Sequence, residues 1–177
     1  VYDSMEPHVT GIFWNQRQPL FRRPEIRRAL TLAINRREMY QVLNLPERTP
    51  LFDVIPTMRQ LQGAEELPEP LPYDPEQAKR LLGEAGWRDS DGDGLRDRDG
   101  KTLRFTAVVW AGWGLENAAV YIQAQLRRVG IQMEIQTLEG SVMNDRFLAG
   151  EFEAAIYRII LGNLNDYRLK PIDSDFD

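Results

Sequence analysis

The chain has 177 residues, of which 42% are hydrophobic and 28% charged, and its net charge is −5. This composition is that of a globular chain with a sizeable core, so it excludes a disordered protein, and the negative balance argues against nucleic acid as a partner. The absence of cysteine excludes disulfides and thiolate catalysis, and the single histidine argues against a His-based catalytic triad.

The first part of the chain predicts one strand followed by two helices. Residues 9–16 read as a short strand and residues 19–23 as a loop. Pro24 opens a helix whose buried face is formed by apolar residues at helical spacing, namely Ile26, Ala29, Leu30, Ala33 and Ile34. Asn35 followed by Glu38 has the spacing of a capping box, which predicts a second helix to about residue 45.

A proline-rich stretch and a capped helix come next. Residues 46–72 have no periodicity, so we expect a long irregular loop. Asp74 is placed to cap a helix, because its carboxylate can accept from the free N–H groups of the first turn. Pro75 suits the first helical position, and Gly86 can take the left-handed conformation that ends the helix. We expect Trp87 to fold back onto the core.

The remaining elements alternate between strands and helices. We expect the Asp/Gly run 89–100 to be a loop and residues 103–109 to form a strand with one buried face. A helix follows at 116–129, and a half-buried strand at 131–136.

The last predicted elements are a short helix and a covered strand. Ser141 is expected to cap the helix, which ends at Gly150. Residues 152–161 are apolar on both faces, as in a central strand. This order of elements predicts an α/β fold with a mixed sheet flanked by helices.

Ligands in α/β sheets sit beyond the carboxyl ends of the strands, and two such ends stand out here. One is the aromatic, Gly-rich loop after the strand 103–109, and the other follows the strand 152–161. The tryptophans of the first loop can offer flat apolar walls with an indole donor, or else cover the edge of the core. The candidate ligand-binding residues are Trp110, Trp113, Gly114, Gly162 and Asn163.

The acidic loop raises the question of a calcium site. Asp89, Asp91 and Asp93 alternate as in an EF-hand loop, with Asp97 at the ninth place. Position twelve is Gly100, so the bidentate glutamate is missing, and neighbouring arginines lower the negative potential. A Gly/Asp turn held by side-chain-to-backbone hydrogen bonds is the alternative that we favour. We therefore expect no metal and no other cofactor, and keep a calcium-stabilised interaction module as a competing interpretation.

Nothing in the sequence indicates catalysis. The arginines between residues 17 and 37 read as a solvated helix face rather than a nucleic-acid surface. There is no nucleophile elbow, no phosphate-cradling glycine loop and no pair of carboxylates in a supporting environment. We therefore expect that the chain is not an enzyme.

Three blocks of sequence carry a resemblance to a known family. They read FWNQRQPLFRRPEIRRALTLAINRREM at 13–39, YDPEQAKRLLGEAGWRDSDGDGLRDRDGKTLRF at 73–105, and IQAQLRRVGIQMEIQTLE at 122–139, the last followed by GEFEAAI at 150–156. In this order they resemble the family 5 solute-binding proteins of bacterial ABC importers, the group that carries peptides and nickel.

The resemblance implies the second lobe of a two-lobe, type II periplasmic-binding-protein architecture. Residues 1–177 would then form a single α/β lobe of a longer protein, an expectation that agrees with an opening sequence unlike a signal peptide. The implied partners are a peptide-like or other small solute, the ABC permease membrane subunits and the missing first lobe, with no nucleic acid. The implied location is the periplasm or the cell exterior, with a lipoprotein anchor compatible with either. The alternative is a ligand-sensing regulatory domain fused to a DNA-binding module.

The chain departs from the resembling family at the end of its last strand. Peptide-binding members place an aspartate shortly after a Gly-Trp pair there, where it binds the α-ammonium of the peptide. In this chain Gly162 stands near that position, the pair is absent, and Asp166 lies a few residues further on. A sugar or a modified peptide therefore fits as well as a peptide with a free amino terminus.

Overall fold

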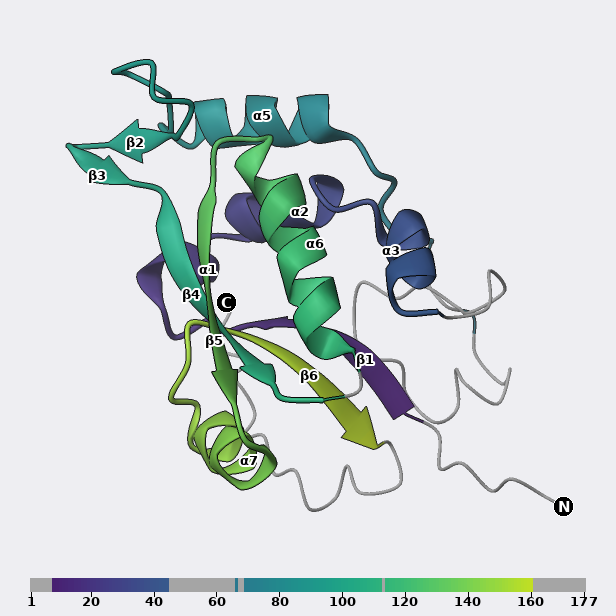
Figure 1. The fold of residues 1–177 in the computed structure, drawn as a ribbon. Coiled ribbons are helices and arrows are strands. Elements are labelled where there is room, and N and C mark those ends of the chain that lie inside the picture. Colours follow the sequence, from purple (N-terminus) through teal and green to yellow (C-terminus); the bar gives the residue numbers. More distant parts are fainter. Residues whose placement is uncertain (1–7, 45–65, 67–68, 113, 161–177) are drawn as a thin grey trace, which may run out of the picture.

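The structure, a computed structural model, describes residues 8–44, 66, 69–112 and 114–160. Most of the loop predicted at 46–72 lies outside these residues, as do Trp113, Gly162 and Asn163. The described residues form a four-stranded sheet with helices packed on both faces, and a separate two-stranded ribbon (Figure 1). The prediction of a mixed sheet flanked by helices is thus confirmed.

The sheet has the strand order β1-β6-β4-β5. Its strands are β1 (His8–Trp14), β4 (Arg104–Trp110), β5 (Gln132–Leu138) and β6 (Ala154–Ile160). Strands β4, β5 and β6 run parallel, whereas β1 is antiparallel to β6. Strand β6 lies inside the sheet, which explains why its sequence is apolar on both faces.

Helices cover the two faces of the sheet unequally. They are α1 (Pro19–Arg22), α2 (Pro24–Leu32), α3 (Arg36–Val42), α5 (Pro75–Glu84), α6 (Leu115–Arg127) and α7 (Gly140–Ala149). The larger core cluster joins α2, α5 and α6 to one face, whereas α7 packs on the opposite face over a smaller cluster around Phe147. Within the described part of the chain, no helix has the length and apolarity of a membrane span.

The predicted helix caps are present. The Asp74 carboxylate accepts from the Gln77 N–H at 2.8 Å, and the Asn35 side chain accepts from the Glu38 N–H at 3.2 Å. Half of the predicted capping box differs, because the Glu38 carboxylate accepts from the Asn35 side-chain amide instead of its backbone. Trp87 is buried, as predicted.

Two predictions about local structure were wrong. The stretch 19–23, expected to be a loop, contains the short helix α1, since Pro19 suits the first helical position and Phe21 is fully buried. Ser141 does not cap α7: the helix already begins at Gly140, after Glu139 in extended conformation.

The acidic loop contains more regular structure than expected. Its second half forms a ribbon of β2 (Asp97–Arg98) and β3 (Lys101–Thr102). Asp99 and Gly100 between them both have positive φ, as a tight two-residue hairpin turn requires. An Asp-Gly pair is the sequence signal for this turn, and it could have predicted the ribbon.

Candidate functional site

The carboxyl ends of the three parallel strands meet at one edge of the sheet. Trp110, the last residue of β4, pairs in register with Leu138, the last residue of β5, and β6 runs parallel beside β4. The first turn of α7 follows directly after β5 and lies beside this edge (Figure 1). The structure thus places Trp110 where ligands of α/β sheets bind.

Trp110 is half-buried and contacts both core clusters. The centroids of the Trp110 and Tyr157 rings are 5.3 Å apart, and the two ring planes make an angle of 34°. An aromatic ring held against a second ring offers a flat, rigid apolar surface at low entropic cost. These contacts agree with the alternative that Trp110 covers the edge of the core. Its role as a wall of a solute site stays a prediction.

Glycines shape the loop from β4 to α6. Gly112 and Gly114 have φ of 119° and 75°, which other residues rarely adopt. The Gly112 N–H donates to the Glu116 carboxylate at 2.6 Å, which fixes the turn before the helix begins. Gly114 is the N-cap residue of α6, in the left-handed conformation, and its contact with a solute stays a prediction.

The three aspartates at the tip of the acidic loop lie close together. Carboxylate atoms of Asp89, Asp91 and Asp93 are within 4.8 Å of one another, and all three residues are exposed. Each carboxylate accepts hydrogen bonds from backbone N–H groups of the same loop. The donors are Gly92 and Gly94 to Asp89, Asp93 to Asp91, and Leu95 to Asp93. This is the side-chain-to-backbone turn that the sequence favoured.

Asp97, the fourth calcium candidate, is not part of this cluster. Its carboxylate accepts from the Ser90 hydroxyl at 2.7 Å and from the Ser90 N–H at 3.0 Å. The Ser90 hydroxyl, and after it the Ser90 N–H, holds the pKa of Asp97 below its usual value. Asp97 therefore ties the start of the loop to the ribbon.

Arg96 anchors the acidic loop, and sequence reasoning did not identify it. Its guanidinium donates to the carbonyl oxygens of Val129 at 2.9 Å and of Trp87 at 2.7 Å. Its backbone N–H donates to the carbonyl oxygen of Gly130 at 2.8 Å. Burial lowers the pKa of Arg96. The three carbonyls come from two different turns, so one arginine joins the ends of α5 and α6.

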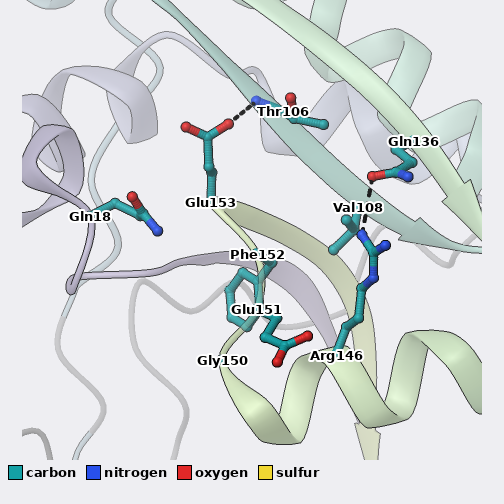
Figure 2. Close-up of a pocket in the computed structure, with 9 residues that line it drawn as sticks. All are labelled: Gln18, Thr106, Val108, Gln136, Arg146, Gly150, Glu151, Phe152 and Glu153. Carbon is teal, nitrogen blue, oxygen red and sulfur yellow. Dashed lines mark hydrogen bonds between the residues drawn. The ribbon is translucent and has the colours of Figure 1, made fainter.

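A hollow of about 330 Å³ lies on the α7 side of the sheet (Figure 2). It is lined by Gln18, Thr106, Val108, Gln136, Arg146, Gly150, Glu151, Phe152 and Glu153. The Glu153 carboxylate accepts from the Thr106 N–H at 2.7 Å, and the Arg146 guanidinium donates to the Gln136 side chain at 3.4 Å. Trp110 and Gly114, the two predicted site residues that the structure describes, are not in this lining. Sequence reasoning missed the hollow because its residues come from separate segments.

The mixed sheet flanked by helices is the fold of part of the known periplasmic binding proteins of the peptide type. A profile of the bacterial extracellular solute-binding proteins, family 5, middle region, matches residues 1–169. The chain belongs to this family.

Individual relatives agree with the family. The oligopeptide-binding protein AppA of Bacillus subtilis is 34% identical over 134 residues, which are 75% of this chain and 24% of AppA. The structure of AppA with a nonapeptide has a TM-score of 0.67 at 29% identity, covering 88% of this chain and 33% of that one. A periplasmic oligopeptide-binding protein of Thermotoga maritima with bound mannohexaose has a TM-score of 0.69 at 25% identity, covering 85% and 29%.

The glutathione-binding protein GsiB of Salmonella choleraesuis is 30% identical over 131 residues, which are 72% of this chain and 22% of GsiB. This chain thus spans about a quarter of the length of the curated relatives that it matches.

Proposed function

We propose that this chain is the second lobe of the substrate-binding component of an ABC importer. Residues 1–177 form that single lobe, with 46–72 as a long irregular loop within it. The observation that carries the proposal is the position of Trp110 at the joint carboxyl ends of β4, β5 and β6, in a chain that belongs to the family.

In this proposal the lobe supplies one wall of a solute site. Trp110, Trp113, Gly114, Gly162 and Asn163 form this wall, and the first lobe supplies the other. The solute is captured as the two hinged lobes close on it, because a clamp can bury most of a ligand that a single wall leaves exposed. The closed protein then docks on the permease, in the periplasm or outside the cell, and a lipoprotein anchor is compatible with this location. The lobe has no catalytic role.

The solute is a peptide or another small polar molecule with flat apolar parts. The names of the relatives support this range, since they include a nonapeptide complex, a mannohexaose complex and a glutathione-binding protein. An indole face suits both apolar side chains and the carbon face of a sugar ring. Gly162, near the place where peptide-binding members carry an aspartate, argues against strict dependence on a free amino terminus.

The direct test is mass spectrometry of the solute retained by the complete protein after gentle purification. We expect a peptide or oligosaccharide, and we expect its affinity to fall in Trp110→Leu, which keeps apolar volume but removes the flat ring. A complete protein that retains no solute, and binds neither a nonapeptide nor mannohexaose in calorimetry, contradicts the proposal. Recovery of free-amine peptides alone would overturn the inference from Gly162.

The regulatory alternative has no specific observation in its favour. The relatives named above are binding proteins, and their names point to transport substrates rather than to DNA. The complete sequence decides between the two: a signal peptide or lipobox supports transport, and a helix-turn-helix supports regulation.

A further inference from the structure

The indole of Trp110 is bounded by two features of the α7 side of the sheet. One is the Tyr157 ring, described above, and the other is Gly140, the first residue of α7. A Cβ atom added at Gly140 would lie 3.0 Å from Trp110 Nε1 and 3.5 Å from Cε2. Such a separation is tighter than ordinary contact, so the indole lies directly on the glycine.

Tyr157 is a fixed support and not a mobile one. It is 4% exposed, and its ring is stacked on Phe147 at 4.7 Å with an interplanar angle of 26°. Its hydroxyl also donates to the Asn144 side chain of α7 at 3.2 Å. Trp110 cannot move toward this side without disturbing a packed cluster, so any displacement has to go elsewhere.

The backbone gives no reason for a glycine at position 140. Its φ is outside the positive region in which other residues are strained, unlike that of Gly150 at the other end of α7. Alanine is a better helix former than glycine, so helix propensity alone would favour a side chain here. A side chain here would instead press on the Trp110 indole, which would have to give way by a few tenths of an ångström.

We propose that Gly140 is a positioning residue that sets where the Trp110 indole lies, and so sets the shape of the apolar wall that meets the solute. This inference rests on the proposed function, because it assigns the wall to a solute site. A side chain at position 140 shifts the indole by a few tenths of an ångström or more. The solutes affected are those with a flat apolar group, either a peptide side chain or a sugar ring.

The test uses the complete protein with Gly140→Ala and the bulkier Gly140→Val. The Trp110 indole N–H resonance, assigned by its absence in Trp110→Leu, should shift in both variants. Affinity for a nonapeptide or mannohexaose, measured by calorimetry, should fall about threefold for alanine and about tenfold for valine. In the Trp110→Leu background the same substitutions should change affinity less than about twofold, because a residue that acts through Trp110 has no effect once the indole is gone.

Gly83→Ala is the matched control. Gly83 is also helical, and its added Cβ would meet only the Arg96 guanidinium at 4.0 Å, so neither resonance nor affinity should change. An unshifted indole resonance in Gly140→Val, or an equal loss of affinity with and without Trp110, overturns the inference. If the unsubstituted protein binds neither probe, the proposed function fails, while the resonance still decides whether Gly140 positions Trp110.

Discussion

Single side chains in this protein hold the backbone at places where it leaves regular structure. Asp74 caps a helix, Asp97 ties a loop to a ribbon, and Glu153 accepts from the first part of β4. Each is a carboxylate that satisfies a backbone N–H, a charge-assisted bond that is stronger than a neutral one. Only Asp74 could be predicted, since its partner is three residues away, whereas Glu153 and Thr106 are 47 apart.

Asp97 gives a prediction about pH. Because donation from Ser90 lowers its pKa in the folded state, its contribution to stability is present above the usual aspartate pKa of about 4 and is lost as pH falls through the lower, folded value. Ser90→Ala should raise the pKa of Asp97 in a carboxyl-carbon NMR titration. Ser141→Ala, on α7, should leave it unchanged. The same titration curve for Asp97 with and without the Ser90 hydroxyl would show that our assignment of the cause is wrong.

Glu153 gives a prediction about stability. Glu153→Ala leaves the Thr106 N–H without its acceptor and should lower the free energy of unfolding by about 1–2 kcal/mol in urea denaturation. Glu153→Gln should lose less, because its amide oxygen can still accept. The neighbouring Glu151→Ala, at an exposed position, should stay within about 0.5 kcal/mol. Equal losses for Glu151→Ala and Glu153→Ala would count against a specific bond to Thr106.

At the scale of elements, the link between the acidic loop and α6 depends on close approach. Gly130, which ends α6, has φ of 87°, and a Cβ added there would lie 2.7 Å from Arg96 Cγ. Arg96 is fixed by three carbonyl oxygens, so it cannot move aside without losing hydrogen bonds. Gly130 is therefore needed for two reasons: its positive φ, and the lack of space for a Cβ atom beside Arg96.

Gly130→Ala and Gly92→Ala separate these two requirements. Both residues have positive φ, which costs alanine about 1–2 kcal/mol, but an added Cβ at Gly92 meets nothing within 4 Å. We expect Gly130→Ala to lower the free energy of unfolding by at least about 1 kcal/mol more than Gly92→Ala, because only it crowds Arg96. Urea denaturation measures both, and equal losses would remove Arg96 from the explanation.

The tip of the acidic loop is held by hydrogen bonds within the loop. Asp89, Asp91 and Asp93 are already bonded to N–H groups of the loop, and Asp97 is engaged by Ser90. We therefore expect isothermal titration with calcium chloride to give no binding heat. Calcium binding that disappears in Asp91→Ala would contradict this expectation and support a calcium-stabilised loop.

Local signals predicted the longer elements and missed the shorter ones. Helix α5 was predicted from Asp74, Pro75 and Gly86, because each acts within one turn of its helix end. The helix α1 and the ribbon β2-β3 were missed, since two- and four-residue elements have no periodicity to read. The prediction of Ser141 as the N-cap was wrong because polar residues lie on both sides of Gly140, the first residue of α7. The N-cap position is taken by Glu139, on the other side of Gly140.

At the scale of the molecule, the sequence predicted which edge of the sheet carries the candidate site, but not the side-chain contacts that form it. The strand-end rule predicted Trp110 in the loop after the strand, and the structure has it as the last residue of β4. Its contact with a solute stays a prediction. Its contacts with Tyr157 and Gly140 join residues that are far apart in sequence, and no local pattern reports them. The hollow of Figure 2 was missed for the same reason.

A lone lobe should bind weakly. If the solute is clamped between two lobes, this chain expressed by itself offers one wall, and a solute on it stays half exposed to water. We expect calorimetry with a nonapeptide to show at least about a tenfold weaker affinity for the isolated chain than for the complete protein. Equal affinities would mean that the solute is held by this lobe alone.

The pairing of β1 with β6 has a consequence for biosynthesis. Arg158 on β6 donates to the Thr10 hydroxyl on β1, and the two residues are 148 positions apart. At about 5–20 residues per second, a ribosome makes β1 on the order of ten seconds before its partner strand exists. During that interval an apolar strand has no edge to pair with, and high contact order makes its later pairing slow. We therefore expect β1 of the nascent chain to stay unpaired, and open to aggregation, until β6 has emerged.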